Sequence, residues 1–138
     1  MDDLAVNVSL PGTIIDLAGL AVPDSFKGGS LVSAMKRPPR PEEETVFYEH
    51  YGAYWGIHPF RVARTRSWKC VDYYGPDDTE ELYNLETDPN EIKNLAGEAD
   101  VSLIQEDLRT AVDQWWLDTG GKDAEFYETE AFKARGRK

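Results

Sequence analysis

Residues 81–96 read ELYNLETDPNEIKNLA, and this stretch decides the fold of the second half of the chain. Its first five residues, Glu81 to Leu85, are rich in apolar and aromatic side chains and precede turn residues, so they predict a short strand. The segment Asp88-Pro89-Asn90-Glu91 predicts the start of a brief helix, because aspartate caps helices and proline fits a first turn. Glu91 is placed to complete a capping box. The whole stretch predicts a structural role and no chemistry.

Three further strands are predicted upstream of Glu81. The runs 45–51, 60–66 and 68–74 are rich in β-branched and aromatic residues, which favour strands. Only a tight turn near Ser67 separates the second run from the third, so these two predict an antiparallel hairpin. Residues 75–78 have the composition of a turn and lead into the fourth strand. Together the four runs predict one antiparallel sheet.

The last predicted element is a helix over 101–119, which Gly120 and Gly121 end. Apolar residues recur along it at helical spacing, and they form one face. That face consists of Ile104, Leu108, Ala111, Val112 and Trp115. The predicted fold class is therefore α+β: a small four-stranded antiparallel sheet packed by a C-terminal helix.

A shorter helix is predicted over 9–19, well ahead of the sheet. Ser9 is placed to cap it, and Gly19 is placed to end it. Its side chains at helical spacing form an apolar face for which no partner is evident in the chain. That face consists of Leu10, Ile14 and Leu17.

A proline-rich segment, 37–41, marks the best boundary, because three prolines in five residues favour an extended chain. The predicted division has four parts. Residues 1–35 form the helix and loop of the first part, 36–44 a linker, 45–121 the sheet with its helix, and 122–138 a flexible tail.

The composition predicts a folded chain and excludes several functional classes. The 138 residues carry a net charge of −11, from 26 acidic and 15 basic residues, and 41% of them are hydrophobic. This acidity argues against binding to nucleic acid or to anionic membranes, which need basic surfaces. No signal peptide or membrane span is visible, so we expect a soluble chain and assign no compartment. Cys70 is the single cysteine, which excludes an intrachain disulfide.

Three segments together resemble the sulfatase family, the formylglycine-dependent enzymes of alkaline-phosphatase-like fold. Residues 10–19 and 28–31 are similar to the family's "DLxPTxLDLAG" helix and "GxSL" loop, although Gly12 stands where proline is frequent and Ser9 where aspartate is frequent. Residues 64–69, RTRSWK, are similar to "VRTxxxKY". The stretch ELYNLETDPNEIKNLA is similar to "ELYDLxxDPxExxNLA". The resemblance covers only the C-terminal end of such an enzyme.

This resemblance implies a C-terminal sulfatase fragment, in which residues 1–35 are a helical remnant of the larger α/β sulfatase domain. It implies that the complete enzyme is a sulfuric ester hydrolase of arylsulfatase type, with a sulfate ester as substrate and calcium as cofactor. The nucleophile motif "CxPSR", the calcium ligands and the sulfate-binding groups would lie upstream. We therefore expect no catalytic, cofactor-binding or metal-binding residue in this chain, and no activity from it alone.

The resemblance also bears on partners. An N-terminal sulfatase chain is one expected partner, and a second copy of this chain is the other, since an uncovered apolar face favours association. The alternative interpretation of the whole chain is a non-catalytic interaction module that complements or binds another protein chain.

One segment, 49–58, is a candidate for substrate contact. It is dense in aromatic residues and holds both histidines, and in related sulfatases the C-terminal subdomain borders the substrate cleft. We therefore predict that this rim is formed by His50, Tyr54, Trp55 and His58. The alternative is a hydrophobic loop that packs against the upstream domain.

Two other candidates have simpler interpretations. Cys70 lies outside any nucleophile motif and is interpreted as a small apolar residue in a strand. Asp77 and Asp78 are interpreted as a solvated acidic turn rather than as ligands for a cation.

Overall fold

The structure, a computed structural model, describes residues 4–36, 44–50, 59–73 and 80–121. The chain divides into two compact units, Met1–Val46 and Phe47–Lys138, which are described separately below. Most of the predicted linker at 36–44 and the whole predicted tail lie outside the described residues, so the four-part division stays a prediction. Within the described ranges, no helix combines the length and the apolar character that crossing a membrane requires.

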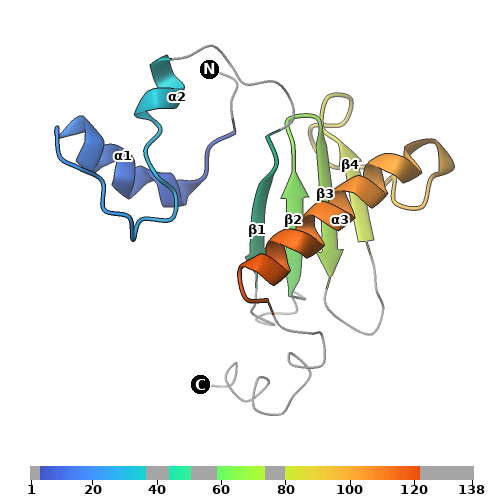
Figure 1. Cartoon of the computed structure of the whole chain (residues 1–138). Helices are drawn as coiled ribbons and strands as arrows, with labels where there is room; N and C mark the ends of the chain where they lie inside the picture. Colours follow the sequence, from blue (N-terminus) through green and yellow to red (C-terminus); the bar gives the residue numbers. More distant parts are fainter. Residues whose placement is uncertain (1–3, 37–43, 51–58, 74–79, 122–138) are drawn as a thin grey trace, which may run out of the picture. The chain divides into compact units, whose positions relative to one another are not determined.

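The second part of the chain is an antiparallel sheet with a helix on one face (Figure 1). The strands β1 (Val46–His50), β2 (Phe60–Arg64), β3 (Trp68–Tyr73) and β4 (Glu80–Asn84) are neighbours in chain order. The helix α3 (Ser102–Asp118) runs across this sheet. The predicted fold class is confirmed, with every strand within two residues of its predicted bounds.

The strand register assigns each side chain to one face of the sheet. Ala63 pairs with Cys70 and Cys70 with Leu82, and these three side chains belong to the core under α3. Since side chains alternate along a strand, Val62 and Val71, which also pair with each other, face away from α3. Both faces of the sheet therefore carry buried residues.

The core lies between the sheet and the predicted face of α3. Leu108 and Val112 are 7% and 0% exposed, which confirms their predicted packing. Trp115 stacks on Phe47 with ring centroids 5.4 Å apart. Trp116, which the predicted face did not include, is also buried.

The C-terminal end of α3 is fixed by its two glycines. Gly120 has φ +88°, a left-handed conformation that ends a right-handed helix. The Gly121 N–H donates to the Trp116 carbonyl at 2.8 Å, and a Cβ at Gly121 would collide with the Trp116 ring. The predicted end of this helix is confirmed.

The predicted helix start at Asp88 is wrong. Residues 85–98 contain turns and no helix, and a short 3-10 turn, η2 (Ala99–Val101), leads directly into α3. Glu91 has φ +55°, which a right-handed helix cannot contain. Asp88 still organises the turn, because its Oδ2 accepts the N–H groups of Ile92 and Lys93, each at 2.8 Å.

The first unit contains the 3-10 turn η1 (Asn7–Ser9), α1 (Leu10–Leu17) and α2 (Val32–Lys36), of which α2 was not predicted. The predicted cap at Ser9 is wrong. Ser9 already has helical dihedral angles because η1 precedes it, and its hydroxyl donates to the Gly28 carbonyl at 2.7 Å instead. The predicted end at Gly19 is confirmed by its φ of +75°.

Small and polar residues hold α1 against the loop before α2. The Thr13 hydroxyl accepts the Leu31 N–H at 2.9 Å, and the Ser30 hydroxyl donates to Asp16 Oδ2 at 2.5 Å. A Cβ at Gly12 would collide with the Gly29 carbonyl, so the helix and the loop meet backbone to backbone. The large side chains Leu10, Ile14 and Leu17 are 54%, 66% and 67% exposed.

Candidate functional site

Of the four residues predicted to form a cleft rim, the structure describes one. His50 ends β1, and its ring stacks on Phe60 with centroids 5.5 Å apart. The His50 Nε2 atom is buried and has no hydrogen-bond partner in the described part of the chain. Tyr54, Trp55 and His58 lie outside the described residues, so the rim stays a prediction.

Cys70 lies in the core and is 1% exposed. Burial raises the pKa of its thiol to about 12, and the nearby charges of Glu80 and Asp72 raise it further in the same direction. A thiol needs to ionise before it can act as a nucleophile. The structure therefore supports the apolar interpretation of Cys70.

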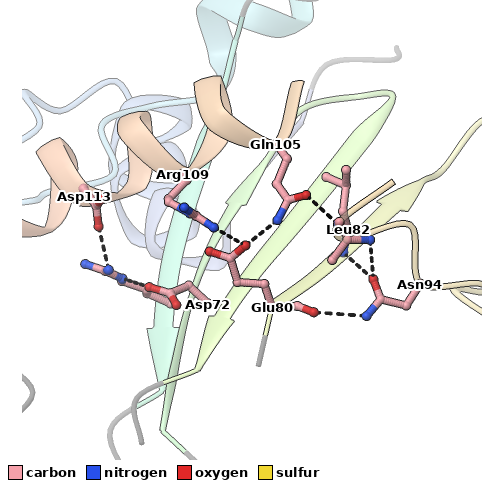
Figure 2. A network of polar contacts seen from close by, with 10 residues as sticks. Asp72, Glu80, Leu82, Asn94, Gln105, Arg109 and Asp113 are labelled. Atoms are coloured by element: carbon pink, nitrogen blue, oxygen red, sulfur yellow. Dashed lines mark hydrogen bonds and ion pairs between the residues drawn. The ribbon is translucent and has the colours of Figure 1, made fainter. Parts of the chain in front are cut away.

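A polar layer, which sequence reasoning missed, joins α3 to the sheet beside the core (Figure 2). The Arg61 guanidinium lies 2.5 Å from Asp72 Oδ2 on β3 and 2.5 Å from Asp113 Oδ1 on α3. It also lies over the Trp116 ring, 4.8 Å from the ring centroid. Arg61 is thus held by both layers of the fold.

Glu80 forms the second half of this layer. Its Oε2 accepts from Arg109 at 2.5 Å and from the amide of Gln105, so one carboxylate joins β4 to two successive turns of α3. Arg109 is half exposed, which makes its ion pair a modest contribution to stability.

The chemical capacity of the polar layer is limited because its cations are already neutralised. Arg61 and Arg109 both pair with carboxylates, so neither is available to bind a sulfate group. Burial raises the pKa of Asp72, although the Arg61 guanidinium acts in the opposite direction. We assign this layer to positioning α3, not to catalysis.

Asn94, within the segment that resembles a sulfatase signature, closes the outer edge of β4. Its Oδ1 accepts the Leu82 N–H at 2.9 Å, and its Nδ2 donates to the Glu80 carbonyl at 3.0 Å. The Leu95 N–H donates to the Leu82 carbonyl at 2.8 Å. This segment therefore satisfies backbone groups that an edge strand would otherwise expose.

No metal centre forms in the described ranges, where no three His, Cys, Asp or Glu side chains converge. Asp77 and Asp78 lie outside those ranges. The resemblance places the calcium ligands upstream of this chain, so calcium in the complete enzyme stays a prediction.

Sulfatases are among the known proteins to which this chain is similar. A solved 2-O glycosaminoglycan sulfatase has a TM-score of 0.64 and 30% identity, over 80% of this chain and 24% of that one. A structure in complex with its substrate D-glucosamine-2-N,6-O-disulfate has a TM-score of 0.70 and 25% identity, over 80% of this chain and 23% of that one. An N-acetylglucosamine-6-O-sulfatase of Bacteroides thetaiotaomicron is 27% identical over 97% of this chain and 25% of its own length.

The family model described as N-sulphoglucosamine sulphohydrolase, C-terminal, matches residues 1–116. The chain belongs to this family of sulfatase C-terminal domains, and the resemblance read from the three sequence segments is confirmed. It spans about a quarter of the length of the curated relative described above.

Proposed function

We propose that the chain supplies the C-terminal subdomain of a sulfuric ester hydrolase and that it hydrolyses no sulfate ester by itself. The observation that carries this proposal is the burial or charge pairing of the side chains that could take part in catalysis. The single thiol, Cys70, is buried with a raised pKa, and three of the described cations, Arg61, Lys69 and Arg109, are paired with carboxylates. Nucleophile, calcium ligands and sulfate-binding groups would come from the upstream part of a complete sulfatase.

The outward face of α1 is apolar and exposed, which favours the binding of another protein surface to the first unit. Leu10, Ile14 and Leu17 are each more than half exposed, while the opposite side of α1 packs on its own loop through Gly12 and Thr13. An exposed apolar row of this kind is typical of a surface that binds another protein surface. We assign its cover to the upstream sulfatase part, and the same face favours the alternative of a separate module that complements another chain.

For the complete enzyme we propose a sulfated sugar as substrate. The names of the matched relatives support this, since they act on an N-acetylglucosamine 6-O-sulfate and on a glucosamine disulfate. We further propose that His50, Tyr54, Trp55 and His58 border the cleft that binds this sugar, because aromatic and imidazole groups stack on sugar rings and donate hydrogen bonds to them.

The first experiment tests the chain alone. It is purified, supplied with calcium and the formylglycine-generating enzyme, and offered a chromogenic aryl sulfate. The expected rate equals that of buffer. Turnover that the Cys70→Ala variant abolishes would contradict both the proposal and the assignment of Cys70 to the core.

The second experiment restores an upstream part. The chain replaces the matching C-terminal quarter of the Bacteroides N-acetylglucosamine-6-O-sulfatase in one fused polypeptide. The expected fusion folds and hydrolyses N-acetylglucosamine 6-O-sulfate. A fusion that unfolds cooperatively but has no sulfatase activity would favour a non-catalytic module.

A further inference from the structure

The face of the sheet opposite α3 carries a side-chain layer with no role so far. Because β2 and β3 alternate, this α3-distal face holds Phe60, Val62 and Arg64 from β2, and Lys69, Val71 and Tyr73 from β3. Val62 and Val71 are buried at its centre, and Phe60 lies edge-on to Tyr73 with centroids 5.8 Å apart. Aromatic residues and arginine around a buried apolar centre are typical of protein interfaces.

Arg64 is the feature of this face that calls for an explanation. Its Nε atom is buried and donates no hydrogen bond within the described part of the chain. Its guanidinium takes part in none of the ion pairs formed there by Asp72, Glu80, Glu91 and Asp113. Arg64 as a whole is only half-buried, but a buried N–H donor without an acceptor still lowers the stability of a fold.

Lys69, which lies opposite Arg64 on β3, supplies no acceptor for it. Arg64 pairs in register with Lys69, so two cations lie side by side on the same face. Glu91 neutralises Lys69 through a contact of 2.5 Å, and that carboxylate is therefore already engaged. Among the described residues, no other carboxylate forms an ion pair with Arg64.

His50 adds an independent observation on the same face. Its ring stacks on Phe60, and its Nε2 atom is buried without a partner among the described residues. The α3-distal face thus has an unsatisfied polar group near each end, His50 beside the start of β2 and Arg64 at the end of β2. Surfaces that become interfaces leave such groups to be satisfied by the other side.

We propose that the α3-distal face is the surface on which the upstream part of a sulfatase docks, and that a carboxylate of that part pairs with Arg64. The inference rests on the proposed function and identifies its partner surface. The curated relative described above carries about three quarters of its length outside the matched region, so an occupant of sufficient size exists in the same polypeptide. In addition, β1 is antiparallel to β2, so the end of β2 that carries Arg64 lies beside the start of β1, where the chain arrives from its upstream residues (Figure 1).

The test measures the thermal unfolding midpoint of an Arg64 variant in two proteins, the isolated chain and the fusion. The proposal predicts a loss of stability only in the fusion. In the 138-residue chain alone, Arg64→Met removes a buried N–H donor that has no acceptor among the described residues, so the thermal unfolding midpoint stays unchanged or rises. In the fusion with the upstream part of the Bacteroides sulfatase, the same change breaks an ion pair, so the midpoint falls by at least about 3 °C. Lys93→Met, at an exposed lysine, is the matched control and changes neither midpoint.

Two outcomes overturn the inference: a lower midpoint for Arg64→Met in the isolated chain, or an unchanged midpoint in the fusion. Arg64→Lys keeps the charge and is expected to recover part of the loss in the fusion, which a purely steric role of Arg64 would not predict. Sulfatase activity is measured separately on the unmodified fusion. A fusion that shows the Arg64 effect without activity would therefore refute the proposed function and leave the docking surface standing.

Discussion

Lys69 Nζ lies 2.5 Å from Glu91 Oε2, and this ion pair joins the β2–β3 hairpin to the turns that follow β4. The two residues belong to two different segments of the sulfatase resemblance, so the contact joins these segments in the fold. Glu91 makes the contact from a left-handed backbone conformation, φ +55°, which is unusual for a residue with a side chain. In this turn, the left-handed conformation of Glu91 goes together with the contact between its carboxylate and Lys69.

A double-mutant cycle of Lys69→Met and Glu91→Gln measures this pair. Both side chains are partly buried, at 18% and 31% exposure, so the expected coupling is about 1 kcal/mol after solvent screening is considered. Urea unfolding of the four proteins gives the value. Single effects that simply add would show that the ion pair contributes nothing to stability.

Asn94→Ala should destabilise the second unit by about 1–3 kcal/mol, because it leaves the Leu82 N–H and the Glu80 carbonyl without their partners. Asn94→Asp is the matched variant. It keeps the acceptor for Leu82 but loses the donor to Glu80, so its loss is also expected to be measurable. Hydrogen exchange should show faster exchange at Leu82 in Asn94→Ala, and equal protection there would contradict the assigned role.

Leu108→Ala should cost about 2–5 kcal/mol, since Leu108 is 7% exposed and belongs to the core cluster. Leu103, on the same helix, is 75% exposed and provides the control. Leu103→Ala is expected to change the free energy of unfolding by no more than about 0.5 kcal/mol. Equal losses in the two variants would refute the packing of α3 on the sheet.

Asp72 and Asp88 should affect the pH dependence of stability with opposite signs. Burial raises the pKa of Asp72, so its contribution is fully present below its unfolded pKa and is lost as pH rises through the folded pKa. Backbone N–H donors from Lys93 and Ile92 lower the pKa of Asp88, so its contribution is present above its unfolded pKa and is lost as pH falls through the folded one.

The measurement compares each aspartate with its Asn variant in denaturant titrations over the acidic range. As pH falls, wild type should gain stability relative to Asp72→Asn and lose it relative to Asp88→Asn. Slopes of the same sign would show that the two carboxylates do not have the environments described.

The Cys70 thiol should not react with a thiol reagent at mildly alkaline pH while the chain is folded, because burial raises its pKa to about 12. Full reaction is expected once denaturant unfolds the chain. Since the folded pKa is raised, stability from this group is present below its unfolded pKa and declines as pH rises through the folded one. Rapid labelling of the folded chain would contradict the burial of Cys70.

The sheet and α3 could be predicted because their signals are local. Runs of β-branched and aromatic residues define the strands, and the spacing of Leu108 and Val112 defines the buried face of the helix. The helix start at Asp88 was wrong because the same residues that cap a helix also shape an open turn, and the left-handed conformation of Glu91 has no signature in the sequence.

The polar layer was missed because it joins residues that are distant in sequence, such as Glu80 and Arg109. Part of it could have been found. A tight turn near Ser67 sets the hairpin register, and that register places Arg61 opposite Asp72. The second carboxylate, Asp113, depends on how α3 crosses the sheet, which is not determined by any local pattern.

The close approach of Gly12 to the Gly29 carbonyl restricts which residues position 12 can accept. The sulfatase pattern that residues 10–19 resemble has proline at this place, but any Cβ at Gly12 would collide with the Gly29 carbonyl. Proline at position 12 therefore requires the loop at 28–31 to move, and that loop holds α1 through Ser9 and Thr13. A side chain at position 12 therefore needs a compensating change in the neighbouring loop before the first unit can keep its packing.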